Sequence, residues 1–172
     1  MRGTGDARAP FFTNEDEKRL LFELSQMSNK NHLRLTKLAL VTGFRRSELL
    51  SLNWSNIDLH KEKIYIRRKE CAAKGSSSSM RMVPLSHKAK DLLISLENKK
   101  GKVINLTEGS ARNGFERARK KAGLLNLRFH DLRHIAISRM WSYGMNALEI
   151  SACSGHRDIK MLMRYSHYQL TY

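Results

Sequence analysis

The side chains best suited to chemistry in this sequence stand in one segment, residues 129–134, which reads FHDLRH. On a helix, His130 and Arg133 share one face, and His134 lies close to His130 because it follows four residues later. Three interpretations compete: a zinc site formed by the two histidines, a helix whose His and Arg side chains are solvated or paired with acids, and a His-x-x-Arg pair that binds phosphate. The zinc interpretation is the weakest, because the HExxH pattern needs a glutamate, whereas here a cation stands between the histidines.

Further segments with chemically active side chains stand before and after this one. A phosphodiester transfer needs a nucleophile, cations on the non-bridging oxygens that gain charge, and an acid for the leaving oxygen. Arginine suits the second role, because its planar fork binds two phosphate oxygens and stays charged at any working pH. In chain order the segments are residues 42–54 (TGFRRSELLSLNW), Lys74, residues 81–85 (RMVPL), residues 130–134 (HDLRH), residues 154–156 (SGH) and residues 164–167 (RYSH).

This series of segments closely resembles the catalytic domain of the tyrosine recombinase (phage integrase) family, over residues 12–168. One segment alone would be weak evidence, whereas several in the family's order and at family-like spacing are a strong signal. The resemblance implies a site-specific DNA recombinase or integrase that cleaves and rejoins DNA through a 3′-phosphotyrosyl intermediate, without metal, ATP or another cofactor. Two other classes stay open: a DNA-binding module of recombinase ancestry that no longer cuts, and a topoisomerase IB-like enzyme that relaxes supercoils.

The resemblance assigns roles to the cationic residues. Arg45 and Arg133 clamp the scissile phosphate, and Glu48, three residues after Arg45 on the same helical face, is expected to hold the Arg45 guanidinium. In the family a lysine on a β-hairpin protonates the leaving 5′-oxygen. Lys74 takes that place here, and Lys69 is an outside candidate.

The resemblance also supplies the nucleophile and its helpers. Tyr165 lies nine residues after His156, as in the family pattern, and is the expected nucleophile; Tyr168 and Tyr172 are rivals only by proximity. Because a tyrosine hydroxyl has a pKa of about 10, it needs nearby cations or a base. His130 and the arginine pair are expected to supply that help. His156 follows a glycine at a helix boundary, where its ring can donate to a phosphate oxygen.

Arg46, Arg81 and Arg128 are candidates for contacts with the DNA backbone. Arg128-Phe129 stands where the family often has Thr-Pro, which removes a usual N-cap and adds a cation near the DNA. The serine-rich stretch after Lys74 makes the hairpin tip longer than usual. Further candidates for backbone contacts are Lys61, Lys63, Arg67, Arg68, Arg112, Arg117, Arg119, Lys120 and Lys121.

Hydrophobic periodicity predicts the elements that must position these residues: an α+β fold, predominantly α-helical, with one small antiparallel β-sheet. Alternation of apolar and charged residues predicts strands over residues 63–67 and 80–85, with a hairpin tip over residues 71–79. Thr13 and Asp16 resemble a capping box, and Ser86 and Ser110 are expected N-caps. The expected helices cover residues 14–27, 33–41, 46–52, 86–96, 110–121, 130–141, 147–153 and 159–165.

The composition limits the class of protein. With 172 residues, 41% of them hydrophobic, we expect one compact unit rather than two large domains. Residues 1–11 are expected to be a linker or an expression remnant. Residues 12–172 are then the catalytic domain, without the core-binding and arm-binding domains of the family. No segment resembles a membrane span or a secretory signal, so a cytoplasmic location is expected. Cys71 and Cys153 stand alone and suggest neither a disulfide nor a zinc site.

The net charge of +16, from 32 Lys and Arg against 16 Asp and Glu, predicts a polyanionic partner. The family resemblance narrows this partner to double-stranded DNA. It also implies other recombinase protomers, which form a tetramer on paired DNA sites in the full-length protein. A membrane surface is the weaker alternative, because no basic amphipathic helix with aromatic anchors is evident.

Overall fold

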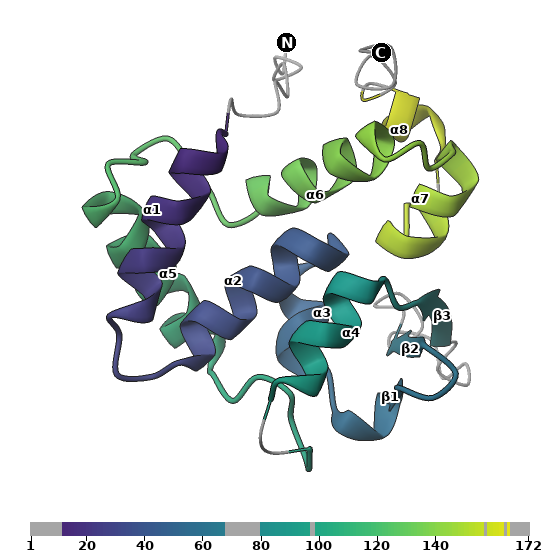
Figure 1. Ribbon diagram of the computed structural model, residues 1–172, viewed down its shortest axis with the longest axis horizontal. Coiled ribbons are helices and arrows are strands. Elements are labelled where there is room, and N and C mark those ends of the chain that lie inside the picture. The colour runs from purple at the N-terminus through teal and green to yellow at the C-terminus, as the bar shows by residue number, and fades with distance from the viewer. Residues whose placement is uncertain (1–11, 68–79, 97–98, 157, 164, 166–172) are drawn as a thin grey trace, which may run out of the picture.

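The computed structural model describes residues 12–67, 80–96, 99–156, 158–163 and 165 (Figure 1). The predictions for residues 1–11 and for the hairpin tip lie outside the described residues. Within them, no helix is both long and apolar enough to cross a membrane. The predicted α+β, mostly helical fold class is confirmed. In chain order the elements are α1 (Asn14–Ser25), α2 (Asn31–Thr42), α3 (Arg46–Ser51), the 3-10 helix η1 (Trp54–Asn56), β1 (Ile57–Asp58), β2 (Lys63–Arg67), β3 (Met80–Pro84), α4 (His87–Ile94), α5 (Glu108–Lys121), α6 (Asp131–Ser142), α7 (Ala147–Ser154) and α8 (Lys160–Met163).

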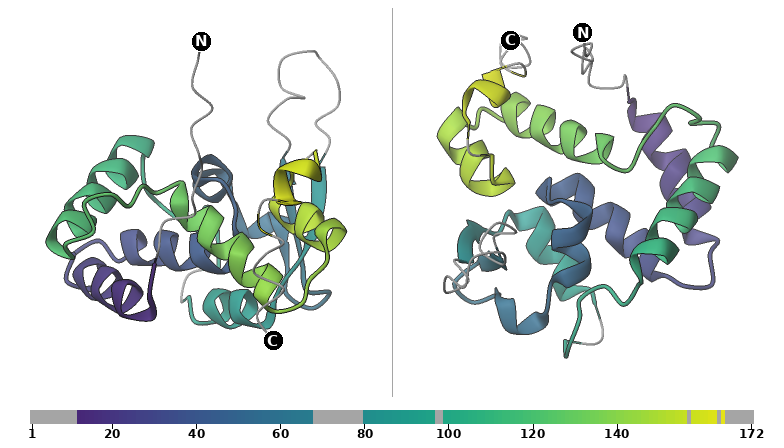
Figure 2. Two further views of the ribbon diagram at one scale, coloured as in Figure 1. Left: turned by 90° about the horizontal axis from the view of Figure 1, so that it is seen from above. Right: turned by 180° about the vertical axis from the view of Figure 1, so that it is seen from behind.

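Helix α2 lies at the centre of the fold, packed against α1, α3, α4, α5 and α6 (Figure 1). Helices α1 and α5 cover one end, while the sheet, α7 and α8 gather at the other, where α7 contacts β3 (Figure 2). Leu35 and Leu38 of α2 and Leu132 and Ile137 of α6 are almost completely buried. Burying one side chain of this size contributes about 1.5–3 kcal/mol. The α2–α6 contact is therefore a stable base for residues at the two helix ends.

The sheet has three antiparallel strands in the order β1-β2-β3, one strand more than the sequence predicts. β1 is only two residues long, too short for an alternating pattern to be recognised. In the β2–β3 pair, Ile64 lies opposite Val83 and Ile66 lies opposite Arg81. All four side chains are buried, whereas Met82 is exposed. Strand β3 therefore turns an arginine toward the interior and a methionine toward solvent.

Of the three helix caps predicted from the sequence, two are confirmed and one is wrong. The capping box at α1 is confirmed: Thr13 Oγ1 accepts from the Asp16 amide at 3.1 Å, and the Asp16 carboxylate accepts from the Thr13 amide at 2.9 Å. Ser86 caps α4 as predicted. The predicted cap at Ser110 is wrong, because α5 begins two residues earlier and Thr107 is its N-cap. The Ser110 amide is the donor to Thr107 Oγ1, at 3.1 Å.

We expect Gly114→Ala to lower the stability of the fold. Gly114 of α5 faces α2 so closely that a Cβ there would lie 2.2 Å from Nδ1 of the buried His32. Overpacking of this kind costs about 1–3 kcal/mol, which outweighs a gain of about 1 kcal/mol in helix propensity. Gly109→Ala in the same helix is the matched control, because nothing lies within 4 Å of its Cβ position. Urea unfolding followed by circular dichroism compares the two; an equal or higher midpoint for Gly114→Ala would contradict the close approach.

Candidate active site

Five candidate catalytic residues come from four separate places in the described chain. Arg45 stands between α2 and α3, His130 and Arg133 at the start of α6, His156 just after α7, and Tyr165 just after α8. These places meet because α2 and α7 both pack on α6, and α8 packs on α7 (Figure 1). The fold thus gathers side chains from both ends of the chain.

Lys74 lies outside the described residues, and so do its rival Lys69 and the rival nucleophiles Tyr168 and Tyr172. The roles that the sequence suggests for these four residues stay predictions.

Arg133 is the buried centre of the site, with 3% of its surface exposed. Its Nη1 donates to the Gly43 carbonyl at 2.8 Å, and its Nη2 lies 3.3 Å from Nδ1 of His156. Gly43 has a φ of 65° where α2 ends, a conformation that glycine adopts without strain. Burial, followed by the charge of Arg45, lowers the pKa of Arg133 to about 10. The guanidinium therefore stays charged at neutral pH.

Arg45 keeps 45% of its side chain exposed and is anchored from one side by a carboxylate. Its Nη1 lies 3.3 Å from Glu48 Oε1, and its backbone amide donates to Glu48 Oε2 at 2.8 Å. The expected contact between Glu48 and the Arg45 guanidinium is confirmed. The Glu48 side chain is only 11% exposed. Arg45 is thus held by a fixed group while much of its surface stays open to a ligand.

Arg81 is 9% exposed and joins three segments around the site. Its Nη2 donates to Glu48 Oε1 at 3.0 Å, and its Nη1 donates to the Cys153 carbonyl at 2.7 Å. Its Cζ lies 5.4 Å from the centre of the Phe44 ring. Its guanidinium also packs against Gly155, where a Cβ would lie 2.7 Å from Cζ. The guanidinium faces acceptors of the protein, and the predicted contact of Arg81 with the DNA backbone stays a prediction. Arg81 ties β3 to α3 and to the end of α7.

Arg46 and Arg128 lie close to the start of α6. Arg46 Nη2 donates to Glu108 Oε1 at 2.9 Å, and its Cζ lies 5.9 Å from the centre of the Phe129 ring. Arg128 is exposed, and its amide donates to Asp131 Oδ2 at 2.7 Å. Helix α6 begins without a side-chain cap at the N-cap position, as the loss of the Thr-Pro pattern predicts. Both arginines stay candidates for DNA contacts.

The histidine in direct contact with Tyr165 is His134. From the sequence, the only role suggested for His134 itself is in the zinc site, the weakest of the three interpretations. Nδ1 of His134 is hydrogen-bonded to the Tyr165 hydroxyl, and the two rings stack at an interplanar angle of 28°. The His130 ring packs edge-on against the His134 ring, with the two ring centres 5.1 Å apart. Partial burial, and then the charge of Arg133, lowers the pKa of His130. Among the described residues, no group of three His, Cys, Asp or Glu could hold a metal ion.

His156 is held by two serines of α7 to which the sequence analysis gave no role. Ser154 Oγ donates to the Ile150 carbonyl at 2.6 Å and lies 2.7 Å from Nδ1 of His156. A hydroxyl carries one proton, so Nδ1 of His156 is the donor to Ser154 Oγ. The Ser151 hydroxyl donates to the His156 carbonyl at 2.7 Å. With its proton on Nδ1, the neutral ring presents Nε2 as an acceptor toward Arg133, whose Nη2 lies 3.4 Å away.

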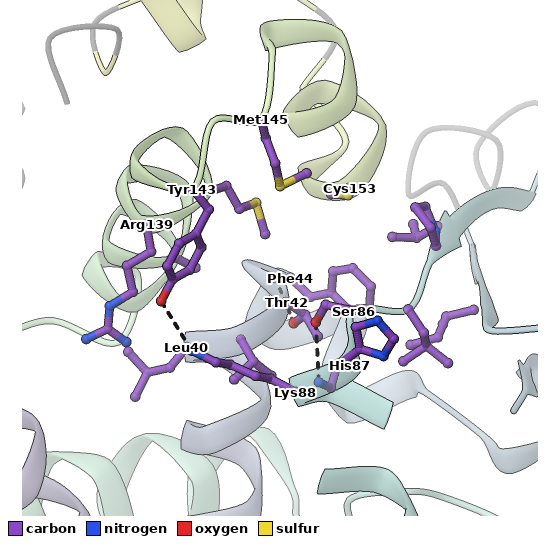
Figure 3. Close-up of a pocket in the computed structure, with 18 residues that line it drawn as sticks. Leu40, Thr42, Phe44, Ser86, His87, Lys88, Arg139, Tyr143, Met145 and Cys153 are labelled. Carbon is purple, nitrogen blue, oxygen red and sulfur yellow. Dashed lines mark hydrogen bonds between the residues drawn. The ribbon is translucent and has the colours of Figure 1, made fainter. Parts of the chain in front are cut away.

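An apolar cavity of about 410 Å³ lies beside the site (Figure 3). Ala136 and Met140 line it from the face of α6 on which Arg133 stands, one and two turns farther along. On its rim, Lys88 Nζ donates to the Tyr143 hydroxyl at 3.2 Å (Figure 3). None of the five described candidate residues lines this cavity. The candidate catalytic residues and the cavity are therefore neighbouring but separate features.

Comparisons of the sequence point to one family. The model of the family described as "Phage integrase family" matches residues 10–171. A shufflon-specific DNA recombinase from Escherichia coli is 36% identical over 160 residues, a match that covers 90% of this chain and 39% of that protein. The chain thus spans less than half the length of this curated relative.

Comparisons of the structure agree with those of the sequence. The solved catalytic domain of bacteriophage HP1 integrase matches with a TM-score of 0.73 and 30% identity, over 94% of this chain and 89% of that domain. A lambda integrase dimer bound to a COC′ core site has a TM-score of 0.68 at 20% identity, over 94% of this chain and 60% of that chain. The second match shows similarity of fold alone.

Proposed function

The chain belongs to the phage integrase family, and on that premise we propose that residues 12–172 form the catalytic domain of a site-specific DNA recombinase. The proposed reaction cleaves and rejoins DNA through a 3′-phosphotyrosyl intermediate. One observation carries the proposal: Arg133 lies within electrostatic range of Arg45 and Tyr165, and its Nη2 is 3.3 Å from His156. This arrangement supports a phosphate clamp formed by Arg45 and Arg133, with Tyr165 as the nucleophile.

The charges of the described site favour a phosphate. One carboxylate, that of Glu48, forms ion pairs with Arg45 and Arg81 and interacts electrostatically with Arg133. Three positive charges thus face one negative charge. A buried cation is costly unless an anion compensates it. A phosphodiester that reaches Arg45 and Arg133 would supply that anion, and its non-bridging oxygens would gain negative charge as the reaction proceeds. Donors fixed before the reaction stabilise such charge without reorganising.

In the proposed step, the Tyr165 oxygen forms a bond to phosphorus while the bond from phosphorus to the 5′-oxygen breaks. Lys74 is the predicted donor of the proton that the 5′-oxygen takes up. The phosphotyrosyl ester conserves the bond energy, so a 5′-hydroxyl of another strand can reverse the step and join new partners without ATP. His156, when its ring carries a proton on both nitrogens, can donate from Nε2 to a phosphate oxygen in both directions of the reaction.

We also propose double-stranded DNA as the partner, with further recombinase protomers assembled as a tetramer on paired sites. The net charge of +16 supports an anionic partner. The lambda integrase of similar fold was solved as a dimer on a DNA core site, which is consistent with this arrangement. Binding that depends on phosphate contacts weakens by about 10³–10⁵ between about 50 and 200 mM salt when six to ten phosphates are contacted.

A pool of nicked duplexes with randomised sequence around the nick tests the proposed chemistry. Cleavage next to the nick frees a short strand that diffuses away, so the covalent intermediate accumulates. We expect a protein–DNA band that survives denaturing electrophoresis, forms in EDTA without ATP, and disappears after protease treatment. Sequencing the trapped DNA would reveal the preferred site.

The same experiment separates the three classes of protein. DNA binding without a covalent band would overturn the proposal in favour of a non-cutting binding module. A covalent band accompanied by relaxation of a supercoiled plasmid, with no strand exchange between two trapped sites, would overturn it in favour of a topoisomerase. A covalent band together with exchange between sites supports the recombinase.

A further inference from the structure

We propose that His134 is a further catalytic residue, whose Nδ1 takes the hydroxyl proton of Tyr165 as the phenolic oxygen attacks phosphorus. The proposal rests on the recombinase function proposed above and deepens it. In the tyrosine recombinase resemblance, the help for the tyrosine falls to His130 and the arginine pair. The structure places a different imidazole against the reacting oxygen.

The contact between His134 and Tyr165 has the geometry that a proton transfer needs. Nδ1 of His134 and the Tyr165 hydroxyl are hydrogen-bonded, and the ring centres are 5.9 Å apart at an angle of 28°. The His130 ring also packs edge-on against the His134 ring, with ring centres 5.1 Å apart at an angle of 88°. A neutral imidazole has one unprotonated nitrogen, and a phenol that points at it is the donor. The proposed transfer uses the tautomer of His134 in which Nδ1 is unprotonated and accepts from the tyrosine hydroxyl.

Burial makes a local proton acceptor necessary. Tyr165 is 3% exposed, so bulk water has little access to its hydroxyl group. A free phenol has a pKa of about 10 and a free imidazole one of about 6.5, so the proton stays on the tyrosine before the reaction. As the oxygen–phosphorus bond forms, the phenolic proton becomes strongly acidic, and an adjacent imidazole then accepts it. The transfer is therefore concerted with the attack.

Two consecutive residues of α6, Arg133 and His134, have different roles in the proposed reaction. Arg133 is bonded to the Gly43 carbonyl and lies next to His156, on the clamp side of the helix. His134 comes next in the chain, about 100° further around the helix, and contacts Tyr165. One helix start therefore fixes both the cation that binds the phosphate and the base that serves the nucleophile.

In the proposed step, each bond that forms is matched by one that breaks, and each proton moves between named groups. The Tyr165 O–H bond breaks and its proton moves to His134 Nδ1, while oxygen bonds to phosphorus. The bond from phosphorus to the 5′-oxygen breaks, and that oxygen takes a proton from Lys74, the predicted acid. On rejoining, the attacking 5′-hydroxyl gives its proton back to Lys74 as its oxygen bonds to phosphorus. The imidazolium of His134 returns its proton to the tyrosine oxygen as that oxygen leaves phosphorus.

His134→Gln tests the proposal, because an amide can hydrogen-bond the tyrosine but cannot take its proton. We expect adduct formation on the trapped nicked duplex to slow by about 10²–10⁴, the usual contribution of general base catalysis. His87→Gln, at an exposed histidine at the start of α4, is the matched control and should react at the wild-type rate. Thermal unfolding of both variants checks that the fold is retained.

Two rescue measurements separate proton transfer from simple positioning. Replacing Tyr165 by a fluorinated tyrosine of lower phenol pKa should restore most of the rate lost in His134→Gln, because that phenol needs less help to lose its proton. A duplex with a sulfur in place of the scissile 5′-oxygen needs no acid for its leaving group, so it should not restore the rate.

The outcomes distinguish this proposal from the proposed function. A His134→Gln rate within about threefold of wild type, against the 10²–10⁴ expected of a base, would overturn the assignment while leaving the recombinase intact. A slow variant that the fluorinated tyrosine does not rescue would also overturn it, and would leave His134 a positioning role. If the wild-type chain forms no adduct on any duplex, the recombinase function itself fails.

Discussion

Tyr165→Phe is expected to abolish the covalent protein–DNA adduct while leaving non-covalent DNA binding close to the wild-type level. Phenylalanine keeps the ring that is 3% exposed but lacks the oxygen that attacks phosphorus. The variant loses its hydrogen bond to His134, which costs about 1 kcal/mol of stability and leaves the fold intact. The net charge of +16 is unchanged, and phosphate contacts dominate the affinity for DNA.

The measurement combines denaturing electrophoresis on the trapped nicked duplex with a native gel on an intact duplex. Tyr143→Phe is the matched control: its ring is 68% exposed and lies near Lys88, away from the clamp. It should form the adduct at the wild-type rate. An adduct that persists in Tyr165→Phe would move the nucleophile to one of the rivals, Tyr168 or Tyr172, and peptide mapping of the adduct would show which.

Local signals explain why most elements of the fold can be predicted from the sequence. The apolar period of α2 and the capping box of Thr13 and Asp16 depend on residues within one or two turns of each other. The prediction of a helix start fails where two nearby residues are both suitable N-caps. Both Thr107 and Ser110 are good N-caps, and the choice between them depends on how α5 packs on α1 and α2. β1 depends on its pairing with β2, which no pattern within two residues can show.

The same distinction between local and long-range contacts applies to the candidate site. The spacing of Arg45 and Glu48 predicts their contact, because the residue before a helix lies close to the residue three positions later, as in a capping box. The contact of His134 with Tyr165 joins residues 31 apart, and that of Arg81 with the Cys153 carbonyl joins residues 72 apart. Such contacts follow from tertiary packing alone. The sequence therefore predicts contacts between residues close in the chain, but not those that tertiary packing brings together.

Arg133→Ala is expected to slow adduct formation by about 10²–10³, the usual effect of removing one donor to a developing oxyanion. The variant also leaves the Gly43 carbonyl without the Nη1 donor, which costs about 1–3 kcal/mol of stability. Part of that cost is offset, because a buried charge is removed with the side chain. The fold should therefore survive, and the loss should appear in the rate at saturating DNA.

Arg133→Lys separates charge from geometry in the same assay. Lysine keeps the positive charge but has no planar fork, so it cannot bond the Gly43 carbonyl and two phosphate oxygens together. We expect it to recover little of the rate. Arg139→Lys is the matched control, because Arg139 stands in the same helix and pairs with Glu17, away from the clamp. Full activity of Arg133→Lys would contradict the clamp, since charge alone would then suffice. Loss in both lysine variants would trace the defect to α6 packing.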